Sequence, residues 1–184
     1  RSHYAGTLVF DKLGRLYLSV GDDWNEMENP QNLKSLRGKI LRLDVSKSKL
    51  EPEIVAYGLR NPWKVSIDSK NRMFIGDVGM RHVESVYLIT DLYSGIPYNL
   101  GWPVFEGTHR STNDSLMFQD TLAPIYEYRH NVCFLSYCGI GGVIGGFYLD
   151  HLEVYLFGDI FGALYLLKKQ KNGKWYLFHH EIIP

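Results

Sequence analysis

The sequence predicts an all-β protein built as part of a β-propeller, and three observations support this prediction. The first is composition: 13 Tyr, 9 Phe and 4 Trp stand beside 18 Gly in 184 residues, which favours strands and turns over helices. The second is a hairpin pattern that occurs three times along the chain. The third is the Gly-Asp pair that closes each copy of this pattern.

The repeated unit reads as a strand, a polar turn and a second strand. It covers residues 7–22, 64–77 and, more loosely, 145–159. Apolar and polar residues alternate within the strands, so each strand is expected to present one face inward and one outward. Residues 39–44 and 163–167 are expected to supply further strands of the same sheets. The repeats therefore predict three to four propeller blades.

The second and third repeats are separated by a longer segment than the first two, so residues 90–128 are predicted to hold a long insertion or surface loop. A blade takes roughly forty residues, and a closed wheel of four to eight blades usually exceeds the length of this chain. An open arc would also expose sheet edges and an apolar flank. Residues 1–184 are therefore predicted to form one partial propeller domain that lacks its N-terminal blades.

Charge and hydropathy exclude several classes of partner. The 20 basic and 20 acidic residues cancel, so no overall field attracts nucleic acid. Residues 168–174 are basic, and the Asn172-Gly173 pair within them predicts a solvated hairpin turn. No stretch approaches the roughly 18 apolar residues of a membrane span. Cys133 and Cys138 are compatible with a local disulfide or with two buried thiols.

Four segments carry residues that the repeat itself does not require. They are His3 ahead of the first strand, Gly58-Leu59-Arg60-Asn61-Pro62-Trp63, Asp77-Val78-Gly79-Met80, and the turn Asn99-Leu100-Gly101-Trp102-Pro103 followed by Glu106-Gly107. The second segment places a guanidinium and an amide just before a proline. In the third, a glycine without a Cβ would let the backbone carbonyl approach a ligand.

Taken in this order, the segments resemble the glucose/sorbosone dehydrogenase family over His3 to about Leu167. That family comprises soluble aldose dehydrogenases built on six-bladed propellers and dependent on pyrroloquinoline quinone. The resemblance implies oxidation of an aldose at the anomeric carbon to the lactone, with hydride passed to the quinone and Ca²⁺ bound beside it. It also implies a sugar substrate, an electron acceptor, and a secreted, periplasmic or extracellular location.

The resemblance also implies roles for individual residues. His3 corresponds to the general base that takes the proton of the anomeric hydroxyl. Arg60 corresponds to the catalytic arginine that binds the quinone and stabilises the negative charge developing on it. Asn61 and His130 are expected to contact the cofactor. The backbone carbonyls of Gly79 and Met80 are expected to bind calcium and the cofactor it carries.

Two positions depart from the family pattern. Ala163 stands where an arginine that binds the cofactor's carboxylates is expected, and Ser2 stands where some members have an aspartate that orients the imidazole. Because of these departures, the sequence is also compatible with a second function. In this alternative the chain is a non-catalytic propeller that binds a protein or a carbohydrate and is similar to relatives of the hedgehog-interacting type.

Other polar residues have simpler interpretations beside functional ones. The acidic loop of Asp22, Asp23, Glu26 and Glu28 could bind calcium or form a solvated turn. By analogy with the family, Glu84 is a candidate ligand of calcium or a residue of a dimer interface. The Trp102-Pro103 turn is expected to be structural. The remaining histidines have no spacing that indicates a set of metal ligands; they are His82, His109, His151, His179 and His180.

Overall fold

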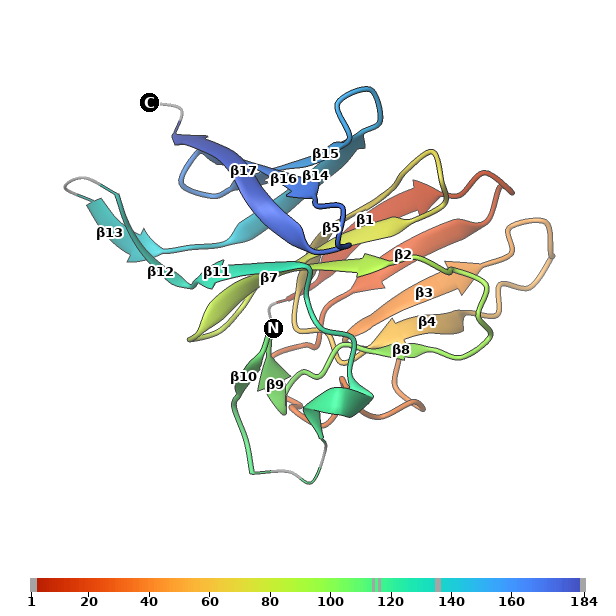
Figure 1. Ribbon diagram of the computed structural model, residues 1–184. Coiled ribbons are helices and arrows are strands. Elements are labelled where there is room, and N and C mark those ends of the chain that lie inside the picture. Colours follow the sequence, from red (N-terminus) through yellow and green to blue (C-terminus); the bar gives the residue numbers. More distant parts are fainter. Residues whose placement is uncertain (1–2, 114, 116, 135–136, 183–184) are drawn as a thin grey trace.

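The computed structural model describes residues 3–113, 115, 117–134 and 137–182. Three antiparallel sheets of about four strands each stand side by side, and a single short 3₁₀ helix, η1 (Phe118–Asp120), is the only helix in the described ranges (Figure 1). The predicted all-β class is therefore confirmed. We call the sheets the first, second and third blade in chain order.

The first blade has the strand order β1-β2-β3-β4, and a short strand, β8, adds to β4 in parallel. The bounds are β1 (Ala5–Phe10), β2 (Leu16–Val20), β3 (Lys39–Leu43), β4 (Glu53–Tyr57) and β8 (Tyr98–Asn99). Its β1–β2 hairpin is the first repeat predicted from the sequence, and β3 is the additional strand predicted at residues 39–44.

The second and third blades follow the same antiparallel plan. The second has the order β5-β6-β7-β11, with β5 (Pro62–Ile67), β6 (Met73–Asp77), β7 (Val83–Ile89) and β11 (Tyr126–Arg129). The third has the order β14-β15-β16-β17, with β14 (Val143–Leu149), β15 (Val154–Asp159), β16 (Ala163–Lys169) and β17 (Trp175–Ile182). The edge strand expected around Tyr126 is β11.

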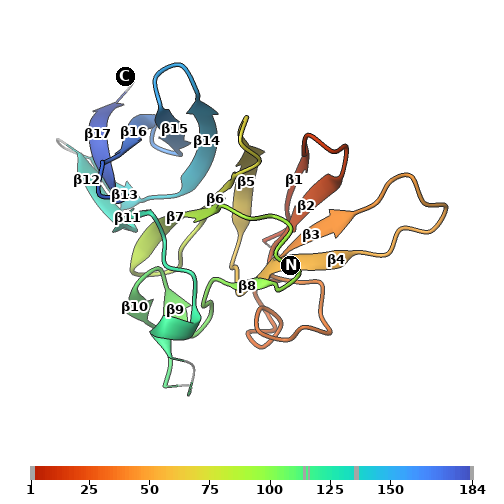
Figure 2. The ribbon, with the colours of Figure 1, turned by 45° about the vertical axis from the view of Figure 1, so that its right-hand side comes forward.

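The first strands of the three blades lie next to one another. Strand β5 contacts both β1 and β14, so the blades follow each other in space as they do in sequence. Figure 2 shows the three sheets fanning out from this line of inner strands. Each inner strand also carries a register shift, at residues 5–8, 62–64 and 143–145. This shared irregularity shows that the three hairpins are copies of one unit.

The segment predicted to be a long insertion connects β7 to β11. It contains β8, the short pair β9 (Phe105–Glu106) and β10 (His109–Arg110), and η1. A second short pair, β12 (Asn131–Phe134) and β13 (Tyr137–Ile140), precedes the third blade and places Cys133 opposite Cys138. The side chains of residues 131–140 are outside the described part of the structure, and with them the state of these two cysteines.

Two apolar cores lie between neighbouring blades. One joins the first and second blades around Tyr17, Ile40 and Ile75, and the other joins the second and third blades. In the latter, the ring of Phe74 on β6 stacks on Tyr155 of β15 with centroids 4.3 Å apart. The cohesion of the arc therefore depends on contacts between sheets, as propeller packing requires.

The surface features that bear on partners agree with the sequence. Of the basic residues 168–174, Lys168 and Lys169 end β16 and residues 170–174 form the β16–β17 turn, in which Gln170 N–H donates to Lys174 O over 2.7 Å and Gly173 adopts a φ of 87°. A left-handed glycine is what a tight hairpin turn demands. Within the described ranges, no helix is long and apolar enough to cross a membrane.

We predict that Phe74→Ala lowers the free energy of unfolding by about 3–5 kcal/mol, because it empties a fully buried site between two blades. Urea denaturation followed by tryptophan fluorescence measures this loss. Phe178→Ala is the matched control, since Phe178 on β17 is 56% exposed and its removal should change stability by less than about 0.5 kcal/mol. If the two variants lost the same free energy of unfolding, Phe74 would not stabilise the packing between the blades.

Candidate functional site

A cavity of about 330 Å³ opens where the inner strands of the blades begin. Its lining comes from the N-terminal segment, from the second and third blades, and from the loops that lead into them. The lining residues are His3, Arg60, Asn61, Trp63, Val78, Gly79, His130, Gly141, Gly142, Val143, Ile144 and Ile160. Concave sites of this size with a few convergent polar groups are typical of small-molecule binding.

His3 is held at the cavity by a buried carboxylate. Its Nδ1 lies 2.8 Å from Asp22 Oδ1, and Trp102 Nε1–H donates to the other oxygen over 2.9 Å. Burial alone would raise the pKa of Asp22, but the hydrogen bonds from His3, the Trp24 N–H and Trp102 outweigh it, and the pKa is lowered. With Nδ1 engaged by Asp22, Nε2 is the imidazole nitrogen that has no hydrogen-bond partner among the described residues.

Gly21 makes the position of His3 possible. A Cβ at Gly21 would lie 1.9 Å from the His3 carbonyl oxygen, so no other residue fits there without moving the histidine. The next residue, Asp22, donates its N–H to Arg60 O over 2.8 Å. The Gly-Asp pair that closes the first repeat thus joins His3 to Arg60.

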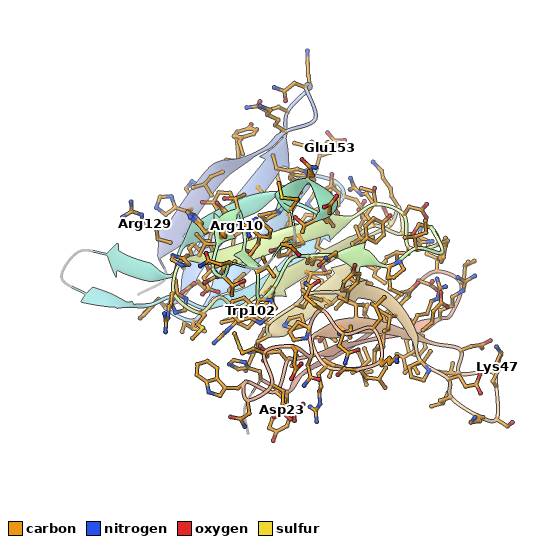
Figure 3. All side chains as sticks on the ribbon, turned by 90° about the horizontal axis from the view of Figure 1, so that it is seen from below. Asp23, Lys47, Trp102, Arg110, Arg129 and Glu153 are labelled. Atoms are coloured by element: carbon orange, nitrogen blue, oxygen red, sulfur yellow. The ribbon has the colours of Figure 1, made fainter. Side chains whose placement is uncertain are left out.

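Arg60 and Asn61 are positioned by the Gly-Asp pair that closes the second repeat. The Asp77 carboxylate accepts the N–H groups of Arg60 and Asn61 over 3.1 and 2.7 Å, and burial raises its pKa to about 7. The guanidinium donates to Val78 O over 3.0 Å and lies 5.7 Å from the Trp102 ring centroid. Figure 3 shows Trp102 beside the loop that carries Asp23, which follows Asp22.

Two buried polar atoms in this wall have no partner among the described residues. They are Nε of Arg60 and Oδ1 of Asn61. A buried polar group without a hydrogen bond costs about 1–3 kcal/mol, so native structures rarely leave one unpaired. A ligand with an acceptor for Arg60 Nε and a donor for Asn61 Oδ1 would satisfy both atoms; the quinone and carboxylate oxygens of the expected cofactor would supply the acceptor.

The segment after Asp77 forms a tight loop around one carboxylate oxygen. Oε1 of Glu106 accepts the backbone N–H groups of residues 80–83 over 2.6–3.3 Å, which lowers the Glu106 pKa despite its burial. A Cβ at Gly79 would lie 1.9 Å from Val83 O, so the loop requires glycine. Gly79 lines the cavity, whereas Met80 lines a separate depression of about 200 Å³ next to it.

His130 faces the same cavity from the edge of the second blade. Its Nδ1 bonds Glu84 Oε1, and the other Glu84 oxygen accepts the Val143 N–H of the third blade over 2.8 Å. Glu84 is fully buried and therefore cannot contact a partner chain, so the dimer-interface role expected by analogy is wrong. Instead, Glu84 ties two blades together beside the cavity.

The third blade contributes apolar side chains to the cavity. Ala163, expected at a position for a cofactor-binding arginine, is buried in the core between the second and third blades and does not line the cavity. The side chains that face the cavity from this blade are Val143, Ile144 and Ile160. Ser2, the other departure from the family pattern, lies outside the described residues.

No group of three or more His, Cys, Asp or Glu residues comes together to hold a metal in the described ranges. The acidic loop is engaged otherwise: Asp22 bonds His3, Asp23 lies 3.7 Å from Arg37, and Glu26 accepts a hydrogen bond from Asn29. Calcium bound by backbone carbonyls of Gly79 and Met80 therefore stays a prediction.

Five residues predicted for the site therefore line one cavity: His3, Arg60, Asn61, Gly79 and His130. Met80 lines the adjacent depression instead. Sequence reasoning missed three residues: Asp22 and Glu84 as partners of the two histidines, and Trp63 as a lining residue. The recurrent Gly-Asp pairs were a signal for Asp22, because the aspartate that closes each repeat is a buried hydrogen-bond acceptor.

Comparisons with known proteins show which proteins the chain is similar to. The HIPL1 protein of Arabidopsis thaliana is 31% identical over 220 residues, covering 95% of this chain and 29% of that protein. The aldose sugar dehydrogenase YliI of Escherichia coli is 29% identical over 118 residues, covering 56% of this chain and 29% of that protein. The chain thus spans less than a third of the length of these curated relatives.

Solved structures show the same fold. The aldose sugar dehydrogenase from Streptomyces coelicolor, in its form bound to pyrroloquinoline quinone, matches with a TM-score of 0.68 at 18% identity. The match covers 96% of this chain and 49% of that one. A family model described as glucose / sorbosone dehydrogenase matches residues 1–134. Because that match includes well over half of its residues, the chain belongs to the glucose/sorbosone dehydrogenase family.

Proposed function

We propose that the protein to which these blades belong oxidises an aldose at its anomeric carbon to the lactone. The observation that carries the proposal is the His3–Asp22 pair opening onto the same cavity as Arg60. Pyrroloquinoline quinone, when bound, would accept the hydride from C1, and Ca²⁺ would polarise its carbonyl. Further blades, beyond the arc described, would complete the walls of the site.

His3 accepts the proton of the anomeric hydroxyl at Nε2. The Asp22 carboxylate holds Nδ1, which fixes the tautomer and stabilises the imidazolium that forms. Trp102 keeps that carboxylate in place through its indole N–H. Because the Asp22 pKa is lowered, the carboxylate is ionised at neutral pH and can balance the charge on the imidazolium.

Arg60 and Asn61 bind and orient the cofactor in this proposal. The unpaired Nε of Arg60 and Oδ1 of Asn61 supply a donor and an acceptor, and the guanidinium charge stabilises negative charge that develops on the quinone oxygens. The carbonyls of Gly79 and Met80 would bind calcium. His130, fixed by Glu84 at the outer edge of the second blade, would contact the cofactor from another side of the cavity.

A second candidate function is non-catalytic binding of a protein or a carbohydrate. It is favoured by the apolar wall that the third blade presents, where Ile144 and Ile160 offer no cation to the cofactor's carboxylates. The similarity to the HIPL1 protein, whose name states no reaction, also leaves this function in place. The electron acceptor and the secreted, periplasmic or extracellular location are proposals from the family resemblance.

Cofactor binding distinguishes the two functions. We predict that the complete polypeptide binds pyrroloquinoline quinone in the presence of calcium, measured as a change in the quinone absorbance, and then reduces an artificial dye when supplied with an aldose. Removal of calcium with a chelator should weaken the binding. Absence of binding at high micromolar cofactor with calcium present would favour the non-catalytic function.

Two substitutions separate cofactor binding from chemistry. His3→Ala should leave cofactor binding intact and lower turnover by about two to four orders of magnitude, because only the proton acceptor is lost. Arg60→Ala should lower both, and Arg60→Lys should restore them only in part, since an ammonium does not reproduce the planar guanidinium. Near-normal turnover of His3→Ala in a quinone-dependent protein would contradict the role given to His3.

Gly21→Ala should reproduce the His3→Ala result without changing the histidine. The added methyl would collide with the His3 carbonyl, shift the imidazole from Asp22 and lower turnover more than cofactor binding. Gly158→Ala is the control, because a Cβ there meets only ordinary contacts at 3.8 Å or more. If steady-state kinetics showed equal turnover for the two variants, the close packing of residue 21 on His3 would not be required for turnover.

A further inference from the structure

The indole of Trp24 lies beside the candidate proton acceptor and the candidate cofactor-binding arginine. Its ring centroid is 5.2 Å from that of His3, at an interplanar angle of 85°, so the two rings meet edge to face. The guanidinium carbon of Arg60 lies 5.4 Å from the centroid of the Trp24 ring. Trp24 therefore contacts two residues of the cavity lining while lying just outside it.

Packing does not explain this placement. The Trp24 side chain is 45% exposed, and neither apolar core of the described residues includes it. The backbone is left-handed at both Asp23 and Trp24, with φ of 67° and 47°, a region that side chains other than glycine rarely adopt. Such strain costs on the order of 1–3 kcal/mol per residue and is concentrated at functional sites.

The strained backbone is fixed by the same carboxylate that holds the histidine. Asp22 Oδ1 accepts the Trp24 N–H over 2.9 Å and lies 2.8 Å from His3 Nδ1. One carboxylate thus sets the position of the imidazole and of the indole together. A large aromatic surface is thereby presented to solvent at a fixed place beside the His3 ring.

The chemistry of sugars fits this arrangement. A pyranose that offers its anomeric hydroxyl to His3 must place its ring next to the imidazole. The face of such a ring consists of C–H groups, which pack favourably on the electron-rich face of an indole. Trp63, which is 55% exposed and lines the cavity, offers a second aromatic surface. Rigid aromatic side chains suit this use because little conformational entropy is lost on binding.

We propose that Trp24 is the stacking platform for the sugar ring of the substrate and is a specificity-determining residue. This inference deepens the proposed function and rests on it, since it assumes a sugar that reaches His3. Axial hydroxyls on the stacked face would lift the ring from the indole. The platform therefore favours pyranoses whose ring hydroxyls are equatorial.

The test uses methyl β-D-glucopyranoside, whose blocked anomeric oxygen prevents oxidation, so that binding is measured without turnover. Saturation-transfer NMR on the complete polypeptide, with calcium and pyrroloquinoline quinone present, should detect binding to the unsubstituted protein. Trp24→Ala should weaken it about three- to tenfold. Trp24→Phe should retain most of it, and Phe178→Ala, which removes an exposed aromatic ring from β17, should leave it unchanged.

Unchanged sugar affinity in Trp24→Ala would overturn the inference, as would the absence of sugar binding to the unsubstituted protein. A parallel absorbance titration with the cofactor separates this inference from the proposed oxidation. Loss of cofactor binding in Trp24→Ala would make Trp24 a residue that positions Arg60 and would also overturn it. Sugar binding that depends on Trp24, in a protein that does not bind the cofactor, would uphold the platform and reject the oxidation.

Discussion

The buried carboxylate at the end of the second strand of each blade is the interaction on which the site depends. Asp22 holds His3, Asp77 holds the backbone of Arg60 and Asn61, and Asp159 accepts the N–H of Gly142. Each carboxylate is removed from water and satisfied by groups of another segment. Because a buried polar group is costly unless it is hydrogen-bonded, these segments are held at the same end of the arc.

The fold was predictable because its unit repeats. Alternation within strands, polar turns and closing Gly-Asp pairs each follow from local physical rules, and their threefold recurrence specified the blades in order. The insertion after β7 was recognised only as excess length, and its three short strands, β8, β9 and β10, were not predicted. Strands of two residues are too short to show an alternation of apolar and polar residues, so a sequence does not predict them.

The site was predictable in its residues and less so in their partners. His3, Arg60, Asn61, Gly79 and His130 meet at one cavity, as the motif order suggested. Asp22 and Glu84 were not predicted as hydrogen-bond partners of His3 and His130. In the sequence, Asp22 belongs to an acidic loop that also fits a solvated turn. Ala163, which stands where the family resemblance implied an arginine, is buried in the core between the second and third blades, and the buried side of a strand cannot be read from a single position.

The insertion between β7 and β11 supplies side chains that no repeat contains. Glu106 shapes the loop after Asp77, and Trp102 bonds the carboxylate that holds His3. The segment also adds β8 to the first blade and supplies Leu92 and Leu100 to the core between the first and second blades, but it lies outside the repeated hairpins. Substitutions at Glu106 or Trp102 would therefore reshape the surroundings of the cavity from a single non-repeated segment, while the hairpins of the blades keep their common architecture.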